Sequence, residues 1–156
     1  MSATSSQLQP AVLRLELMCD LAEARRASQA IHSFLAQAGC PESDILDCEL
    51  ALVEACNNAI LYAQGPARAQ QVIVEALCDP QVIEFRVADH TAGFEWPKEV
   101  SLPDPESESG RGLYLIRSLM DEAAYQRGAE ANVLVLRKKR LEKALTFDRT
   151  APAPEA

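Results

Sequence analysis

The chain has 156 residues, of which 48% are hydrophobic, and this is enough for one substantial core and one domain. Its 23 acidic residues outnumber the 15 lysines and arginines, so the formal net charge is -8. An acidic protein has little nonspecific attraction to nucleic acid or to anionic lipid, so we expect protein and nucleotide partners. No run reaches the roughly 18 apolar residues of a membrane span, and the first nine residues lack the pattern of a secretion signal. We therefore expect a cytoplasmic protein with neither a nucleic acid nor a membrane partner.

The five cysteines show no C-x-x-C spacing that would indicate a metal site or a redox pair. They are Cys19, Cys40, Cys48, Cys56 and Cys78. Because they fall in predicted strands and helices, we expect reduced and mostly buried thiols, as is usual in the cytosol.

The first predicted elements are a strand and a helix. Residues 1–10 are polar and are predicted to be a disordered N-terminus. Alternation of apolar and polar residues over 12–18 predicts a strand, and Asp20 is placed to cap a helix over 21–38. Gly39 then ends this helix.

A second helix is predicted to begin at Pro41 and to end before Gly65. Its helical period is carried by Leu46, Leu50, Val53 and Leu61. Glu54 and Asn58 lie four residues apart and so share one face. A carboxylate beside a carboxamide suits a proton acceptor next to a magnesium ligand, because magnesium prefers hard oxygen donors. An ordinary solvent-exposed Glu/Asn pair on a helix has the same spacing.

Two strands over 72–77 and 82–89 are separated by Asp79-Pro80, which predicts an antiparallel hairpin. Asp89 ends the second strand. A carboxylate there is able to accept a hydrogen bond from an exocyclic amine such as adenine N6. The same residue type is also common as a turn former.

A long loop over 94–109 follows, rich in proline, serine and acidic residues. It is either an ordinary surface loop or a gate, and its place between two ligand motifs favours gating. Gly110-Arg111-Gly112 then opens a helix over 111–120. Such an opening presents free backbone N–H groups to phosphate, although a loop that only needs positive φ has the same sequence.

The C-terminal part predicts two more strands, over 122–127 and 132–138, with a turn at Gly128. The basic run at 137–143 is a solvated strand end or a docking surface for an acidic partner. Residues 146–156 are predicted to be a disordered tail.

The predicted fold class is α+β, and the domain is expected to span residues 11–145 as a two-layer α/β sandwich. Its sheet is expected to be mixed and mainly antiparallel, with the helices on one face. A ligand would then lie between the sheet and the helices.

Three segments, in this order and spacing, resemble the ATP-binding boxes of the GHKL superfamily of gyrase, Hsp90, histidine kinases and MutL, which share the Bergerat fold. They are Val53-Glu54-Ala55-Cys56-Asn57-Asn58-Ala59-Ile60, Val87-Ala88-Asp89 with Gly93-Phe94, and Gly110-Arg111-Gly112-Leu113. Within that superfamily the chain is most similar to the small bacterial anti-sigma-factor serine/threonine-protein kinases of partner-switching systems. The resemblance extends over nearly the whole chain.

The resemblance implies a role for particular residues. The catalytic base falls on Glu54, the magnesium ligand on Asn58 and the adenine-reading aspartate on Asp89. The residues implied in shaping the nucleotide pocket and the phosphate loop are Thr91, Gly93, Gly110, Arg111, Gly112 and Leu113. Two residues depart from the family pattern: Thr91 replaces the first glycine of D-x-G-x-G, and Tyr62 stands where many members have histidine. Thr91 would narrow the pocket or hydrogen-bond the base.

The implied activity is ATP-dependent, magnesium-dependent phosphorylation of a serine or threonine on a small anti-anti-sigma antagonist protein. A sigma factor or another target protein would be the second partner, the protein would be a homodimer, and the loop over 94–109 would be the nucleotide lid. Exposed Arg25 and Arg26 are candidates for contacting an acidic protein. The alternative is a noncatalytic module that sequesters a sigma factor or the antagonist. The catalytic domain of a histidine kinase is a weaker alternative, since His32 and His90 read as helix-surface and loop residues.

Overall fold

A computed structural model describes residues 9–97 and 111–140 of the chain. Its five strands form one sheet in the order β1-β2-β3-β5-β4, and all four strand pairings are antiparallel. The strands are β1 (Ala11–Leu17), β2 (Val72–Cys78), β3 (Val82–Asp89), β4 (Glu122–Arg127) and β5 (Asn132–Lys139). The helices are α1 (Leu21–Gln37), α2 (Glu42–Leu61), the short 3-10 helix η1 (Gly65–Ala69) and α3 (Arg111–Leu119). Every predicted helix and strand is present, and only η1 was not predicted.

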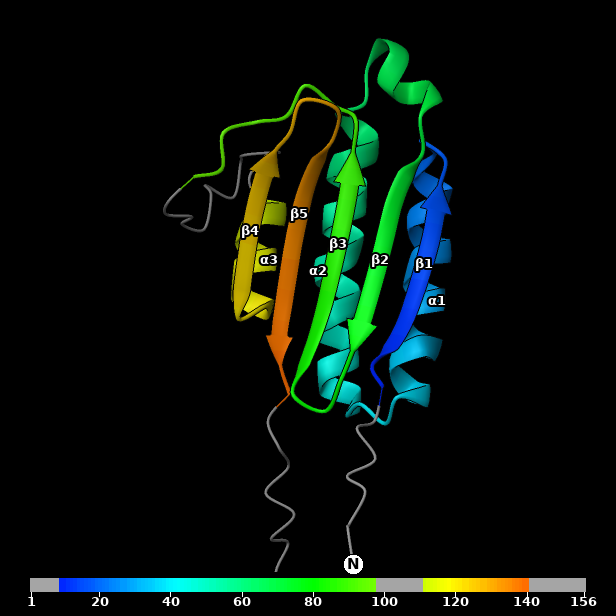
Figure 1. Ribbon diagram of the computed structural model, residues 1–156, viewed down its shortest axis with the longest axis vertical. Coiled ribbons are helices and arrows are strands. Elements are labelled where there is room, and N and C mark those ends of the chain that lie inside the picture. The colour runs from blue at the N-terminus through cyan, green and yellow to red at the C-terminus, as the bar shows by residue number, and fades with distance from the viewer. Residues whose placement is uncertain (1–8, 98–110, 141–156) are drawn as a thin grey trace, which may run out of the picture.

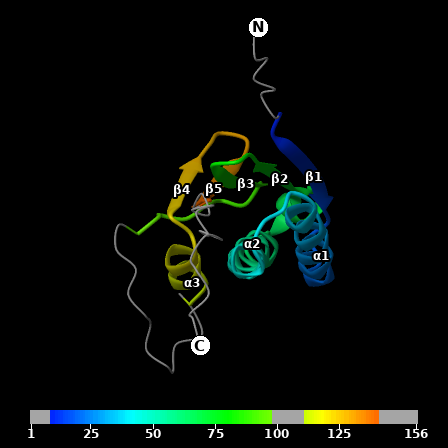
Figure 2. The ribbon, with the colours of Figure 1, turned by 90° about the horizontal axis from the view of Figure 1, so that it is seen from below.

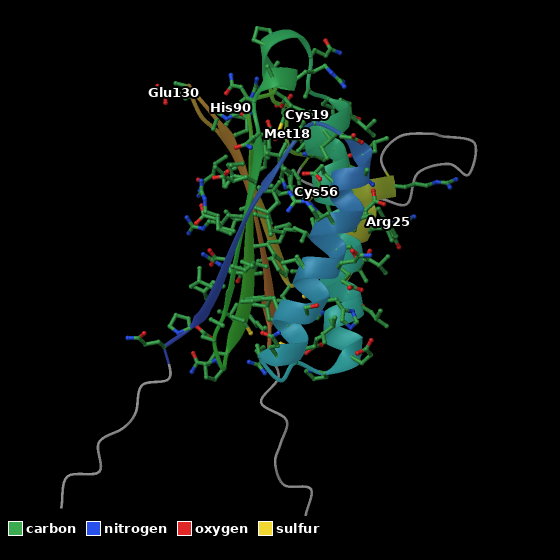
Figure 3. The ribbon with its side chains drawn as sticks, turned by 90° about the vertical axis from the view of Figure 1, so that its right-hand side faces the viewer. Met18, Cys19, Arg25, Cys56, His90 and Glu130 are labelled. Atoms are coloured by element: carbon green, nitrogen blue, oxygen red, sulfur yellow. The ribbon has the colours of Figure 1, made fainter. Side chains whose placement is uncertain are left out.

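The sheet and the helices form two layers, which confirms the predicted α+β sandwich, although the described sheet is antiparallel throughout and not mixed. Figure 1 shows the five strands side by side, and Figure 2 shows α1, α2 and α3 together on one face of the sheet. The core between the layers includes Leu17, Phe85 and Leu136 from the strands and Ile31, Leu52 and Ile116 from the helices, all fully buried. Figure 3 shows Cys56 between α2 and the sheet, with Arg25 on the outer side of α1.

The start of α1 is fixed by Asp20, as its sequence predicts. The Asp20 carboxylate accepts a hydrogen bond of 2.9 Å from the backbone N–H of Ala22. We expect Asp20→Ala to lower the free energy of unfolding by about 1 kcal/mol, because an N–H group at the helix start loses its acceptor. Urea unfolding measures this change. Gln29→Ala, at an exposed position in the middle of α1, is the matched control, and an equal loss there would contradict a capping role.

The buried face of α2 is not the one marked by its leucines. Leu46, Leu50 and Leu61 are 48%, 53% and 59% exposed. The buried face consists of Ile45, Cys48, Ala51, Leu52, Ala55, Cys56, Ala59 and Ile60. The helix itself is confirmed, but of its leucines only Leu52 faces the core, and most of the buried face consists of alanine and cysteine side chains, which let α2 approach the sheet closely.

The outer face of the sheet carries a row of ion pairs. Glu84 lies 2.8 Å from both Arg86 and Arg137, and Arg137 reaches Glu122 at 3.3 Å. Partial burial acts to raise the pKa of Glu84, but the hydrogen bonds from Arg86 and Arg137 outweigh it and the pKa is lowered. Arg137, which begins the basic run at 137–143, is therefore paired within the sheet.

Lys138, the next residue of that run, points into the molecule. Its ammonium group lies 3.2 Å from the Asp47 carboxylate and donates a 2.9 Å hydrogen bond to the carbonyl of Leu119. It thereby connects β5, α2 and the end of α3. Three of the four described cations of the run, Arg137, Lys138 and Arg140, are thus used within the fold, which supports the strand-end interpretation for this part of the run.

Three predictions fall on residues outside the described part of the chain. The first is the predicted disordered N-terminus, of which only residues 9 and 10 are described. The second is the tail over 146–156, and the third is the predicted lid over 94–109, which is described only as far as residue 97. Among the described residues, no helix combines the length and apolarity needed to cross a membrane.

Candidate active site

A cavity of about 410 Å³ lies at one end of the sheet, between the sheet and the α2 and α3 helices. This volume is within the usual range for small-molecule sites. Its walls come from the C-terminal half of α2, the end of β3 and the loop after it, the start of α3, and β4 and β5. The segments that carry the three sequence motifs therefore meet around one cavity.

Asp89 is a buried carboxylate at the wall of this cavity, with 8% of its surface exposed. Its Oδ1 atom accepts three hydrogen bonds: from the Thr91 backbone N–H at 2.9 Å, the Thr91 hydroxyl at 2.7 Å and the Asn132 amide at 3.1 Å. A buried charge needs such donors. Within the described residues, all of them contact Oδ1, which leaves Oδ2 as the oxygen available to a ligand.

Thr91, the departure from the glycine of the family motif, takes part in this arrangement. Its hydroxyl donates to Asp89 and accepts a 3.2 Å hydrogen bond from the backbone N–H of Gly93. The side chain therefore fixes the loop after β3, and it lines the cavity without closing it.

Asn132 is a site residue that the sequence motifs do not include. It opens β5 directly opposite Asp89, is 4% exposed, and donates from its amide both to Asp89 and, at 2.8 Å, to the carbonyl of Thr91. The sequence signal for Asn132 is a polar residue at the start of a strand. Its relation to Asp89 can be recognised only when the register between β3 and β5 is known.

Gly93 occupies a position that strongly favours glycine. Its φ is +79°, in the left-handed region, and a Cβ there would lie 2.8 Å from Nε of Arg127 and 3.2 Å from Oδ1 of Asn132. Arg127 also donates a 2.9 Å hydrogen bond to the carbonyl of Ala92. At the same end, the His90 ring lies 2.8 Å from the carbonyl of Glu130, and Figure 3 labels both residues. The loop after β3 is thus held against the β4–β5 turn.

An aromatic cluster forms one side of the cavity. Phe94 stacks on Tyr125 with ring centroids 4.5 Å apart, and Trp96 lies 6.0 Å from each of them. The Arg117 guanidinium lies 5.0 Å from the centre of the Trp96 ring. Burial, followed by the nearby charge of Asp89, raises the pKa of Tyr125. Its hydroxyl is buried and makes no hydrogen bond of normal geometry within the described residues, although the Thr91 side chain and the Phe94 backbone lie close enough to act in the direction that lowers this pKa.

Glu54, Asn58 and Gly112 meet where α2 contacts the start of α3. A Cβ on Gly112 would lie 2.8 Å from Oε2 of Glu54 and 3.6 Å from Nδ2 of Asn58. The φ of Gly112 is not positive, so this glycine is needed for the close approach of a carboxylate rather than for a special backbone conformation. Asn58 and Gly112 line the cavity, whereas Glu54 is not one of its lining residues and lies against Gly112.

We expect Gly112→Ala to lower the kcat of the ATP-dependent activity that the sequence resemblance implies by roughly two- to tenfold. The added methyl group would displace Glu54 from its side-chain conformation, at a cost of about 0.5–1.5 kcal/mol. Steady-state kinetics with ATP measures the effect. Ser118→Ala, an exposed position on the same helix, is the control; equal rates for both variants and the wild type would contradict the close-approach role.

The remaining predicted residues take different positions. Leu113 lines the cavity, whereas Arg111 is exposed at the first position of α3 and lies outside the lining. Tyr62 ends α2 at the mouth of the cavity and is 59% exposed. Gly110 lies outside the described residues.

The oxygen donors of the site fit magnesium. Among the described residues, no group of three or more His, Cys, Asp or Glu side chains is arranged to hold a metal ion. Magnesium needs no such group, because it is usually bound by one or two protein oxygens together with phosphate and water. Asn58, beside the Glu54 carboxylate, supplies a donor set of this kind.

Residues 17–138 match the family model of the histidine kinase-like ATPase domain. The chain belongs to this family, and its motifs surround the cavity described above.

Relatives of the chain include serine-protein kinases. It is 31% identical over 104 residues to the serine-protein kinase RsbW of Bacillus velezensis, which covers 61% of this chain and 65% of the relative. It is 33% identical over 93 residues to the protein of the same name from Bacillus cereus, covering 54% of this chain and 58% of the relative. The matched region thus spans less than two thirds of the length of these relatives.

A solved structure supports the same fold. The crystal structure of the RsbU and RsbW domains of a Mycobacterium tuberculosis protein matches with a TM-score of 0.63 and 22% identity. The match covers 82% of this chain and 31% of the other.

Proposed function

We propose that this protein is an ATP-dependent, magnesium-dependent serine/threonine-protein kinase that acts on a small anti-anti-sigma antagonist protein. One observation supports this most: a single cavity is lined by the buried, oriented carboxylate of Asp89 and by Asn58 and Gly112, where α2 meets the start of α3 and Glu54 lies against Gly112. The Asp89 carboxylate suits the base of ATP, and the residues at the start of α3 suit its phosphates. The similarity to proteins named serine-protein kinase supports a protein serine as the phosphate acceptor.

In the proposed mechanism, Oδ2 of Asp89 accepts a hydrogen bond from the adenine N6 amine. The backbone N–H groups at the start of α3 bind phosphate oxygens, as helix N-termini commonly do. Glu54 accepts the proton of the attacking hydroxyl. Asn58 would hold magnesium, which when bound neutralises charge on the phosphate oxygens.

The proposed partners follow from this activity. The unphosphorylated antagonist would sequester the kinase, and its phosphorylation would release the kinase to bind a sigma factor or another target protein. We further propose that the protein works as a homodimer in the cytoplasm. Size measurement in solution with and without ATP tests the dimer.

The direct test uses ATP labelled in its γ-phosphate, magnesium, and a small antagonist-domain protein from the same genome. We expect label on one serine or threonine of the antagonist, and none when EDTA removes magnesium. Binding of ATP without transfer to any such antagonist would instead favour the noncatalytic module. Thr91 no longer argues for that module, since its hydroxyl supports Asp89 and leaves the cavity open.

A further inference from the structure

Two buried thiols lie in contact at the end of the sheet that is remote from the cavity. Cys40 is in the connection between α1 and α2, Cys78 is the last residue of β2, and their sulfur atoms are 3.7 Å apart. They are 9% and 4% exposed. Figure 1 shows the α1–α2 connection and the β2–β3 turn at the same end of the molecule. Among the described residues, no other two sulfur atoms make such a contact.

We propose that Cys40 and Cys78 are a modification site, at which a peroxide oxidant produces an internal disulfide. The sulfur atoms need to move from 3.7 Å to a bond length of about 2.05 Å. Cys40 lies in the connection between α1 and α2, where its backbone N–H donates a 3.0 Å hydrogen bond to the Leu35 carbonyl of α1. Each cysteine has one rotatable side-chain bond that moves its sulfur, so we expect the approach to come from side-chain rotation. The pair is reduced in the structure, as the sequence predicts for all five cysteines.

Arg140 distinguishes the two sulfur atoms, and we assign the first attack to Cys78. A guanidinium nitrogen of Arg140 lies 3.6 Å from the sulfur of Cys78, where it would face the negative charge of the attacking sulfur. Burial, followed by the neighbouring Cys78 thiol, raises the pKa of Cys40 to about 11. Cys40 therefore keeps its proton at neutral pH and acts as the resolving thiol.

The oxidation takes place in two balanced steps. The Cys78 thiolate attacks one peroxide oxygen, the O–O bond breaks, and hydroxide leaves with its electron pair, so that Cys78 becomes a sulfenic acid. The sulfur of Cys40 then attacks Cys78, the S–S bond forms, the S–O bond breaks, and water leaves with the Cys40 proton. The peroxide is reduced and the two thiols are oxidised.

The disulfide would close a loop over residues 41–77, which contains all of α2. A cross-link of this length restricts the unfolded chain, and we expect it to raise the melting temperature by roughly 10 °C. Ile83, which pairs with Cys78 in the sheet, is six residues from Asp89 on the same strand, or about 20 Å. The cross-link would therefore leave the cavity unchanged, and the proposal does not depend on the proposed kinase activity.

Mass spectrometry of the full chain tests the proposal. The reduced protein is treated with hydrogen peroxide, its remaining thiols are alkylated, and it is digested with trypsin and a glutamate-specific protease. The second protease is needed because cleavage after Glu42 and Glu49 separates Cys40 from Cys48 and Cys56. We expect a loss of the mass of two hydrogens in the intact chain, and a linked pair of peptides that contain Cys40 and Cys78.

Melting curves of matched variants complete the test. Cys40→Ser should lose both the linked peptides and the rise in melting temperature, whereas Cys19→Ser should keep both, since Cys19 is far from this pair along the fold and only partly buried. The peptide map of the wild-type protein tests for the Cys40–Cys78 link even where a variant folds poorly. Oxidation confined to Cys19, links only between different molecules, or a linked protein with an unchanged melting temperature would overturn the proposal.

Discussion

Replacement of Glu54 by glutamine is expected to lower phosphoryl transfer by roughly 10² to 10⁴-fold, the usual range for the loss of a general base. The amide keeps the size of the side chain, so it should still fit against Gly112, where the carboxylate oxygen lies 2.8 Å from the place of a Cβ. It cannot accept the proton of an attacking hydroxyl. The affinity for ATP should therefore stay near that of the wild type, and kcat should fall with little change in KM.

Single-turnover transfer from labelled ATP, with nucleotide binding measured by calorimetry, separates these two quantities. Glu42→Gln is the matched control, because Glu42 is an exposed residue at the other end of α2. A variant at Glu54 that transfers phosphate at the wild-type rate would remove this residue from the proposed mechanism. A parallel loss of ATP binding would mean that Glu54 acts on nucleotide binding instead.

The order of the elements was predictable because each has a strong local signal. Asp20 and Pro41 mark helix starts, Asp79-Pro80 marks the hairpin turn, and strict alternation marks β3, whose Ile83, Phe85 and Val87 all face the core. The sheet order was not predictable in this way. β5 lies between β3 and β4, and no local pattern determines which edge a later strand will join.

The face that α2 buries shows a second limit of the sequence. Leucines usually mark the core side of a helix, yet Leu46 and Leu50 are exposed, while Cys48, Ala55 and Ala59 are buried. The choice depends on how closely the helix approaches the sheet, and that distance is a property of the packed layers. Glu54 and Asn58 were still found, because their spacing depends only on the helical period.

The residues of the cavity also divide into those that the sequence predicts and those that it does not. Asp89 and Gly93 belong to a motif that is continuous in sequence, whereas Asn132 and Tyr125 enter from β5 and β4 and become neighbours of the motif only through strand pairing. Asn132 donates the third of the three hydrogen bonds to Oδ1 of Asp89, beside two from Thr91, so the part of the site that the sequence missed helps to orient the predicted residue.

That orientation leads to the second large expected effect, for Asp89→Asn. The new amide must turn its oxygen toward the donors of Thr91 and Asn132, because its nitrogen would face three donor groups there. Its N–H₂ group then faces the cavity, where the adenine amine is also a donor. We expect ATP binding to weaken by about 1.5–3 kcal/mol, which is roughly 10- to 150-fold in Kd.

Inosine triphosphate, which has a carbonyl oxygen in place of the adenine amine, makes this test specific. The carboxylate of the wild type repels that oxygen, whereas the amide of Asp89→Asn is able to donate to it. Calorimetry should therefore show a preference for ATP over the inosine nucleotide in the wild type, and a much smaller or reversed preference in the variant. Thermal unfolding of both proteins serves as the control for the fold. The contrary outcome is that binding of both nucleotides weakens equally in a variant that is still folded. Asp89 would then support the cavity wall without contacting the base, because a change in the wall alone affects both exocyclic groups in the same way.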